Sequence, residues 1–301
     1  MLLGYCFSVS VHIEQKMVST DRLEFATLQC GSGPLALCLH GFPDSAHSWR
    51  HLLPRLAEAG FHAVAPFMRG YAPTAIPADG AYQTCELGLD ANALHEALGG
   101  DHEAVIIGHD WGATGAYAAA IIDPSRWSKV VGMSVPPWGS MARAFIGNLE
   151  QIRRSWYMFY FQHPLADLVV PANDLAFIDM IWKSWSPGFD SSLDARNAKD
   201  CLADPANLQA ALGYYRATLG NGYRNPANQE LQELVGRDTP PQPVLYLHGS
   251  NDGCIGIEVA RDAAAHAPEN ARVVEIPDAG HFIQLERPDD VARAVLEFVK
   301  R

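Results

Sequence analysis

Residues 104–120 read AVIIGHDWGATGAYAAA, and this stretch decides the fold. Its first part, Ala104–Ile107, is a short apolar run with β-branched residues, which is typical of a buried parallel strand. Small residues at helical spacing follow, so the stretch predicts a strand, a sharp turn and a helix. Asp110 stands in the middle of the turn, where we expect a strained backbone conformation. Gly108 and Gly112 flank it because a Cβ at either position would collide with the neighbouring chain.

On both sides of this turn, runs typical of buried strands alternate with helical segments. The strand-like runs are Leu35–Leu39, His62–Ala65, Lys129–Val135, Pro243–His248 and Arg272–Ile276. The helical segments are approximately Trp49–Ala59, Thr84–Leu98 and Asp289–Val299. An alternating run, Arg22–Cys30, precedes the turn signal at 31–34 and predicts a strand of an edge hairpin. The alternation predicts an α/β fold with a mostly parallel sheet flanked by helices.

The stretch 138–237 lacks strand signals and is rich in tryptophan and tyrosine. We interpret it as a helical cap inserted above the carboxyl edge of the sheet, where such sheets bind ligands. The expected organisation is a first core part at 17–137, the cap at 138–237 and a second core part at 238–301. Residues 1–16 lack the basic region and cleavage site of a signal peptide. An extended start, with Met17 as the natural beginning, therefore competes with a targeting role.

The composition excludes several function classes. The 301 residues carry a formal charge of −12 and are 48% hydrophobic, which suits a large core but not a polyanion-binding surface. No basic stripe, nucleic-acid motif or membrane span stands out. The cysteines show no CxxC pair or regular spacing, so we expect free thiols in a reducing cytoplasm, with no disulfide framework and no metal site. They are Cys6, Cys30, Cys38, Cys85, Cys201 and Cys254.

Three residues follow strands in the order nucleophile, acid, base. Asp110 occupies the serine position of a G-x-S-x-G nucleophile elbow, although aspartate is also a common helix N-cap. Asp252 follows the strand ending at His248, and His281 follows the last strand. We predict that His281 activates water and that Asp252 orients it, against plain roles as a loop histidine and a turn residue. Asp278 is poorly placed to orient His281.

The loop His40–Pro43 follows the strand expected beside the elbow. A loop at this place donates backbone N–H groups to an oxyanion, and we predict that the N–H groups of Phe42 and Trp111 form the oxyanion hole. The Phe42–Pro43 bond is a candidate cis peptide. We also expect His40, Pro43 and Trp111 to contact the substrate. The alternative is an ordinary turn between strand and helix.

A carboxylate nucleophile changes the reaction class. Attack on an ester would give a reactive anhydride, whereas attack on an electrophilic sp3 carbon gives a stable alkyl ester. Hydrolysis of that ester at its carbonyl needs an oxyanion hole and an activated water. Suitable carbons are those of an epoxide or an alkyl halide. An epoxide needs an acidic O–H donor for its oxygen, and a halide needs N–H donors.

From about Asp21 to the C-terminus, the chain resembles the soluble epoxide hydrolases of the α/β-hydrolase superfamily. The motifs that carry the resemblance are the segments 40–45, HGFPDS, and 108–112, GHDWG. The resemblance implies the α/β-hydrolase fold and conversion of an epoxide to a vicinal diol. Two departures concern the pocket: Phe67 stands where the family often has aspartate, and residues 253–256 replace a loop that usually bears proline.

In that family two cap tyrosines hold the epoxide oxygen. The segment Ser155–Gln162 looks like the first tyrosine segment, with Tyr157 at the matching position, and Leu212–Arg216 looks like the second, with Tyr215 matching. Tyr160 and Tyr214 are the alternative assignments, and all these side chains could instead be core aromatics of a helical cap.

Two other functions remain open at this point. A haloalkane or haloacid dehalogenase could use the indole N–H of Trp111 to bind the halide. However, Phe42 stands where haloalkane dehalogenases often carry asparagine. The chain also lacks the arginine that follows the nucleophile in fluoroacetate dehalogenases. A non-catalytic binding protein would not require nucleophile, acid and base together. We expect a small-molecule epoxide and water as partners, neither nucleic acid nor membrane, no cofactor or metal, and a monomer or homodimer.

Overall fold

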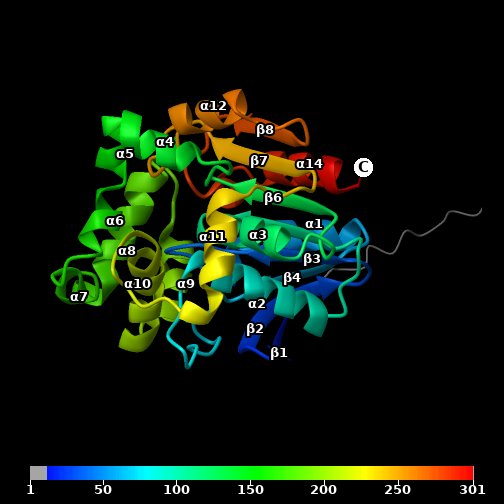
Figure 1. Cartoon of the computed structure of the whole chain (residues 1–301), viewed down its shortest axis with the longest axis horizontal. Helices are drawn as coiled ribbons and strands as arrows, with labels where there is room; N and C mark the ends of the chain where they lie inside the picture. Colours follow the sequence, from blue (N-terminus) through cyan, green and yellow to red (C-terminus); the bar gives the residue numbers. More distant parts are fainter. Residues whose placement is uncertain (1–11, 301) are drawn as a thin grey trace, which may run out of the picture.

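The computed structural model describes residues 12–300 (Figure 1). Eight strands of this part of the chain form one sheet in the order β1-β2-β4-β3-β5-β6-β7-β8. The neighbours from β4 to β8 run parallel, while β1 and β2 pair antiparallel at one edge. The strands are β1 Glu14–Ser19, β2 Glu24–Gly31, β3 Leu35–Leu39, β4 His62–Pro66, β5 Val105–His109, β6 Lys129–Met133, β7 Val244–Gly249 and β8 Ala271–Ile276. The predicted mostly parallel α/β sheet is confirmed.

Helices cover both faces of the sheet. Helix α1 connects β3 to β4, and α2 connects β4 to β5 in the opposite direction along the sheet. Because parallel crossovers are right-handed, the two helices lie on opposite faces. Helix α3 packs beside α2, and α14 contacts α1. The helices of this part are α1 Leu52–Glu58, α2 Thr84–Ala97, α3 Trp111–Ile122, α12 Ile257–Ala265, α13 Ile283–Glu286 and α14 Pro288–Val299.

Between β6 and β7 the chain is helical, from Ser140 to Arg237. We call this stretch the cap; in Figure 1 it lies largely at the left, beyond the arrowheads of the parallel strands. Its helices are α4 Ser140–Gly147, α5 Leu149–Arg154, α6 Trp156–Tyr160, α7 Ala166–Val169, α8 Ala172–Trp185, α9 Ser192–Leu202, α10 Pro205–Leu219 and α11 Gln229–Arg237, with the 3-10 turn η2 Pro226–Asn228. The side chains over the carboxyl ends of the strands therefore come from helices.

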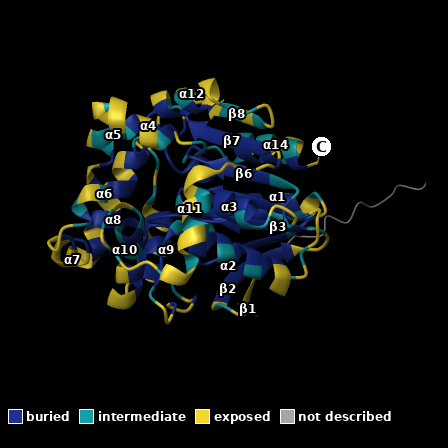
Figure 2. Cartoon of the chain, viewed as in Figure 1, coloured by how far each residue is buried: buried dark blue, intermediate teal, exposed yellow. Residues whose placement is uncertain are grey.

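The central strands form the core because both of their faces are covered. Leu37, Ile106, Val131 and Leu245 are fully buried at the middle of four adjacent strands. Figure 2 shows the buried residues along the inner strands and the exposed ones on the outer sides of the helices. Continuous burial explains why these strands are apolar throughout and do not alternate.

Some element boundaries differ from the sequence prediction. The helix expected from Trp49 is a 3-10 turn, η1 Ala46–Trp49, followed by α1 from Leu52, because Pro54 has no N–H and is tolerated only in the first turn of an α-helix. β6 ends at Met133, before the expected Val135, since Ser134 turns out of the sheet with φ of 64°. β1 starts at Glu14, ahead of the core boundary expected at residue 17.

The targeting role that we considered for residues 1–16 falls largely on residues 1–11, which lie outside the described range. Between residues 12 and 300, none of the helices combines the length and the apolar character that crossing a bilayer requires. In the same range Cys30, Cys38, Cys85, Cys201 and Cys254 are free, buried thiols.

Candidate active site

Asp110 lies on a sharp turn between β5 and α3. Its backbone has φ of 53° and ψ of −121°, a conformation that costs energy for any residue other than glycine. A Cβ on Gly108 would overlap with the carbonyl group of Gly112, and a Cβ on Gly112 would overlap with that of Leu39. The two glycines therefore allow the turn to pass close to its neighbours, and the turn presents the Asp110 side chain at the carboxyl edge of the sheet.

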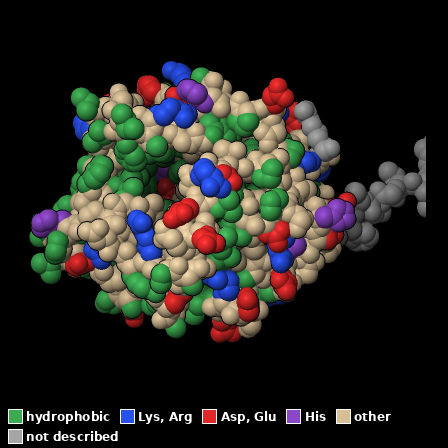
Figure 3. Space-filling model, viewed as in Figure 1, with side chains coloured by type: hydrophobic (Ala, Val, Ile, Leu, Met, Phe, Trp, Pro, Cys, Tyr) green, Lys and Arg blue, Asp and Glu red, His purple; other side chains and the backbone are tan. Residues whose placement is uncertain are grey.

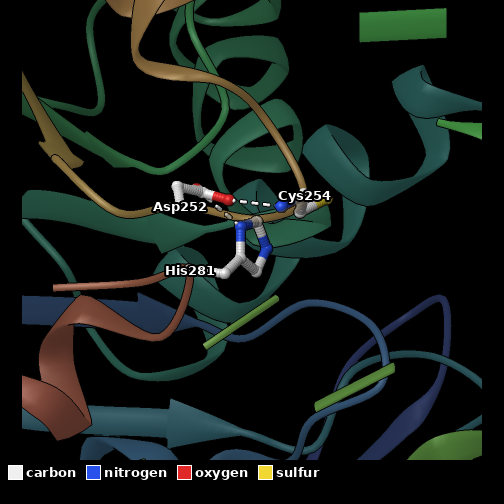
Figure 4. A group of neighbouring side chains, drawn as sticks. All are labelled: Asp252, Cys254 and His281. Atoms are coloured by element: carbon white, nitrogen blue, oxygen red, sulfur yellow. Dashed lines mark hydrogen bonds and ion pairs between the residues drawn. The ribbon is translucent and has the colours of Figure 1, made fainter. Parts of the chain in front are cut away.

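Loops from two more strands bring a histidine and a second carboxylate to the same place. His281 Nε2 lies 3.4 Å from Asp110 Oδ2, and His281 Nδ1 lies 2.9 Å from Asp252 Oδ2. Asp252 and His281 follow β7 and β8, and Figure 4 shows the carboxylate facing the imidazole. All three side chains are buried. The structure thus brings together the three residues predicted as nucleophile, acid and base.

Backbone amides hold Asp252 as an anion. Its Oδ1 accepts hydrogen bonds from the N–H of Cys254 at 2.7 Å and of Ile255 at 2.9 Å. The first of these is drawn in Figure 4. The turn after β7 therefore fixes the carboxylate that faces His281.

The electrostatics of the three groups are coupled. Burial alone would lower the pKa of His281, but the carboxylates of Asp252 and Asp110 outweigh it and raise this pKa to about 10. Burial would likewise raise the pKa values of Asp110 and Asp252, but interactions with His281 hold both below the ordinary value. At neutral pH the resting site is an imidazolium between two carboxylates.

The loop after β3 supplies an amide to Asp110. The N–H of Phe42 donates to Asp110 Oδ1 at 2.8 Å, and the Phe42–Pro43 bond is cis, as expected. Gly41 lies so close that a Cβ there would overlap with the Asp110 side chain. Trp111 is the first residue of α3, so its N–H has no partner within the helix. Of the two N–H groups predicted for the oxyanion hole, that of Phe42 contacts the Asp110 carboxylate, and that of Trp111 follows Asp110 directly in the chain.

Tyr157 of α6 and Tyr215 of α10 come together near Asp110. Their ring centroids are 5.7 Å apart, and both side chains are fully buried. Tyr215 Oη has no hydrogen-bond partner among the described residues, while Tyr157 Oη lies 3.3 Å from Cys254 Sγ. Burial raises the pKa of both phenols well above 10. The pair is therefore held as protonated O–H groups.

The two alternative tyrosines are engaged elsewhere. Tyr214 Oη donates to the carbonyl of Arg69 at 2.8 Å, which removes its hydroxyl from the site. Tyr160 is half-buried and stacks on Phe177, with the ring centroids 6.2 Å apart. Of the four candidates, Tyr157 and Tyr215 are the ones that face each other near Asp110.

His40, Pro43 and Trp111 were expected to contact the substrate. Trp111 lines the cavity that opens from Asp110, whereas His40 and Pro43 do not. His40 Nε2 accepts from the N–H of Met68, and its Nδ1 donates to the carbonyl of Gly41, both at 2.9 Å. The carbonyl of Pro43 accepts from the indole of Trp182 at 2.8 Å. Buried polar groups need such partners, so these two residues hold the loop after β3 in place.

A cavity of about 480 Å³ extends from Asp110 to the surface. Figure 3 shows a hollow on this face of the molecule, edged largely by hydrophobic side chains. Asp110, Trp111 and Tyr215 lie along the cavity wall. Apolar side chains of α3 and the cap make up much of the remainder, among them Tyr117, Ile121, Met141, Phe145, Met158, Leu219 and Val235. The cavity suits a small apolar molecule.

Cys254 is the residue of the site that sequence reasoning missed. Its N–H holds Asp252, and its thiol lies beside Tyr157. The sequence signal that could have pointed to it is the loop 253–256, which replaces the proline-bearing loop usual in the family. Within the described residues, Asp252, Cys254 and His281 are also the one group whose ligand atoms lie close enough for a metal ion. Asp252 and His281 already bond to each other, so the donor set fits a hydrogen-bonded pair better than a coordination site.

Comparisons with known proteins point to one family. The family model described as the alpha/beta hydrolase fold matches residues 34–288. The chain is 30% identical to epoxide hydrolase A of Mycobacterium tuberculosis, over 95% of this chain and 97% of that protein. It is also 30% identical to mouse epoxide hydrolase 3, over 98% of this chain and 79% of the relative. The crystal structure of epoxide hydrolase A from Mycobacterium thermoresistibile superposes with a TM-score of 0.73 at 27% identity and covers 96% of this chain and 98% of that one.

Proposed function

The chain belongs to the epoxide hydrolases of the α/β-hydrolase superfamily, and we propose that Asp110 is the nucleophile with which it opens an epoxide. The observation that carries this proposal is a carboxylate at the strained turn, 3.4 Å from His281 and on the wall of an apolar cavity. Phe42 N–H holds Oδ1, which leaves Oδ2 to attack. The enzyme converts the epoxide and water to a vicinal diol.

In the first step an Asp110 carboxylate oxygen bonds to an epoxide carbon while the carbon–oxygen bond of the ring breaks. Tyr157 and Tyr215 hold the departing oxygen, and one phenol transfers its proton to it. Their burial supports this role because it keeps both phenols protonated in the resting enzyme. The product is a hydroxyalkyl ester of Asp110 with a neutral hydroxyl group.

Forming the ester changes the charge around His281. The ester is neutral, so one of the two carboxylates that raise the pKa of His281 disappears. The imidazolium then loses a proton, and the phenolate left by the first step regains one. His281 is left neutral, with Nε2 beside the ester, and can act as a general base.

In the second step His281 takes a proton from water, and the hydroxide adds to the carbonyl carbon of the Asp110 ester. The N–H groups of Phe42 and Trp111 stabilise the oxyanion. The bond between the acyl carbon and the alkyl oxygen breaks, and the departing alkoxide takes the proton of the newly added hydroxyl group. The diol leaves, and the Asp110 carboxylate and the imidazolium are restored. Asp252 stabilises the imidazolium through its bond to Nδ1.

A single turnover in ¹⁸O water tests this mechanism. Because hydroxide attacks the acyl carbon, the solvent oxygen enters the Asp110 carboxylate, and the first diol carries unlabelled enzyme oxygen. With enzyme in excess over epoxide, we expect the label in the peptide that contains Asp110. Label in the first diol and none in that peptide would mean that water attacks the epoxide directly.

The cysteines support a reducing location. All five cysteines of residues 12–300 are free and buried. A chain working in the cytoplasm would keep them as thiols. We therefore place the enzyme in the cytoplasm as part of this proposal.

A further inference from the structure

Asp44 and His109 form a buried pair behind the nucleophile. Asp44 follows β3 and is 1% exposed, and His109 ends β5 and is fully buried. Asp44 Oδ2 and His109 Nδ1 lie 3.8 Å apart. Each atom lacks a hydrogen-bond partner among the described residues. Because buried polar atoms are rarely left without a partner, two such atoms facing each other call for an explanation.

The other ring nitrogen settles the state of His109. Nε2 lies 2.9 Å from the backbone carbonyl of His281, and a carbonyl oxygen only accepts hydrogen bonds. Nε2 therefore carries a hydrogen. Burial, with the positive charge of His281, lowers the pKa of His109 to about 3, so the ring is neutral and Nδ1 carries a lone pair. The atom that faces Asp44 is an acceptor.

The surroundings of Asp44 give a carboxylate little support. Its Oδ1 accepts a hydrogen bond from the N–H of Ser45 at 2.7 Å, and the hydroxyl of Ser48 also acts to lower the pKa of Asp44. Asp252, in contrast, is bonded by two backbone amides and by His281. Burial raises the pKa of Asp44 to about 8, and the negative charges of Asp194 and Asp110 act in the same direction.

The remaining titratable groups around Asp44 supply no free positive charge. Arg50 is already paired with Asp194 on α9. Tyr71, in the loop after β4, and Cys201, on α9, are neutral hydroxyl and thiol groups whose pKa values are raised by burial and by Asp44. An anion at Asp44 would therefore set an oxygen lone pair against the lone pair of His109 Nδ1 and add a negative charge beside Asp110.

We propose that Asp44 is a neutral carboxylic acid that donates its proton to His109 Nδ1 and thereby positions the catalytic base. The hydrogen-bonded chain runs from the Asp44 hydroxyl through the His109 ring to the backbone carbonyl of His281. A contraction of about 1 Å brings the Oδ2–Nδ1 distance into the hydrogen-bond range. Asp44 touches neither epoxide nor water, so it is a positioning residue. Its effect on turnover rests on the function proposed above; its protonation does not.

Substituting Asp44 and Asp252 one at a time distinguishes an aspartate that acts as a neutral hydrogen-bond donor from one that acts as an anion. The amide of Asp44→Asn can still donate to His109 and accept from Ser45, so this variant should keep kcat within about threefold of wild type at pH 7. Asp44→Ala should lower kcat about tenfold or more with little change in KM. The matched control is Asp252→Asn. It should lower kcat by more than about a hundredfold, because that site needs the negative charge.

The pH profile provides a readout that a merely structural role would not move. Wild type should lose kcat as Asp44 ionises above about pH 8, and Asp44→Asn should lack this loss. An Asp44→Asn variant as impaired as Asp44→Ala would show that the charge is needed, and a fully active Asp44→Ala variant would show that Asp44 positions nothing. Either result would overturn the proposal.

Infrared spectroscopy of the wild-type enzyme tests the protonation without substrate. At pH 7 we expect the C=O stretch of a neutral carboxylic acid, which disappears at high pH and is missing from Asp44→Asn. The absence of such a band from folded wild type at pH 7 would overturn the proposal. This outcome is independent of whether the enzyme opens epoxides: a chain without epoxide turnover but with the band would contradict the proposed function alone.

Discussion

At the residue scale, neighbours rather than residue type decide what each aspartate does. Asp110 and Asp252 are both buried, and each faces one nitrogen of His281. Asp252 is also bonded by two amides of its own loop, whereas Asp110 lies on the cavity wall. The first arrangement suits a fixed anion that orients the base. The second suits a nucleophile that must reach a ligand.

The two cap tyrosines give the first prediction. Tyr215→Phe removes an O–H that can donate to the epoxide oxygen, so alkylation of Asp110 should slow by about a hundredfold in single-turnover kinetics. Tyr157→Phe should act in the same direction. Tyr214→Phe is the matched control, because Tyr214 already donates to the carbonyl of Arg69. It should cost about 1–3 kcal/mol of stability but leave alkylation within about threefold. Equal kinetic losses at 214 and 215 would refute the assignment.

His281 gives a pH dependence of stability. Its pKa is about 10 in the folded chain and about 6.5 when unfolded, so between these values the folded state holds a proton that the unfolded state has lost. The contribution of His281 to stability is complete below about pH 6.5. It falls as the pH rises towards 10, by up to about 1.4 kcal/mol per pH unit.

Chemical denaturation of wild type and His281→Gln between pH 6 and 10 measures this effect. The free energy of unfolding of wild type should fall more steeply with rising pH than that of the variant. Parallel curves would mean that His281 is not charged in the resting enzyme.

Sequence motifs predicted the site residues far better than their surroundings. Asp110, Asp252 and His281 could be named because each follows a strand at the edge where parallel strands end. The sequence could not reveal the contact of Cys254 with Tyr157, since α6 and the loop after β7 meet only through the tertiary fold. We expected His40 to contact the substrate, and the sequence could not reveal that both of its ring nitrogens bond to the backbone. The catalytic roles themselves stay predictions.

At the scale of elements, the turn between β5 and α3 depends on close backbone approach. Gly108→Ala places a Cβ against the carbonyl of Gly112 and should cost about 3 kcal/mol or more, with loss of activity. Gly236→Ala, in helix α11, is the control: no atom lies within 4 Å of its added Cβ, so stability should rise by up to about 1 kcal/mol. Thermal unfolding of both variants checks this, and a tolerated Gly108→Ala would be inconsistent with the tight turn.

The order and type of the elements were predictable, and their ends were less so. Apolar runs with β-branched residues identified the parallel strands because burial on both faces demands such runs. The start of α1 depends on where Pro54 can be tolerated, and the end of β6 depends on the turn at Ser134. Such ends are decided by backbone geometry that hydrophobic patterns do not record.

At the scale of the whole molecule, the cap and the sheet enclose a space that neither forms alone. The cavity wall combines α3 with α4, α6, α10 and α11. Its charged members are Asp110, Arg237 and Asp238, and the last two form an ion pair with each other. The substrate space is thus largely apolar. Its dimensions could not be predicted from the sequence, because they depend on how the cap helices dock.

Two adjacent residues of α4 test the cavity. Phe145 lines it, whereas Ile146 is 89% exposed and does not. Phe145→Ala should raise the ratio of kcat/KM for bulky over small epoxides by severalfold because it enlarges the space. Ile146→Ala should leave the ratio unchanged. If both variants shift the ratio equally, or neither does, the substrate occupies a different space.

The covalent ester on Asp110 is the central claim, and intact-mass spectrometry of His281→Gln tests it most directly. Without the base, alkylation proceeds and hydrolysis stops, so incubation with a panel of epoxides should add the mass of one whole epoxide, located by peptide mapping on Asp110. The double variant that also carries Asp110→Ala should add none, and a parallel haloalkane panel should give no alkyl adduct. An epoxide-treated His281→Gln that stays unmodified while wild type turns the same epoxide over would contradict the account.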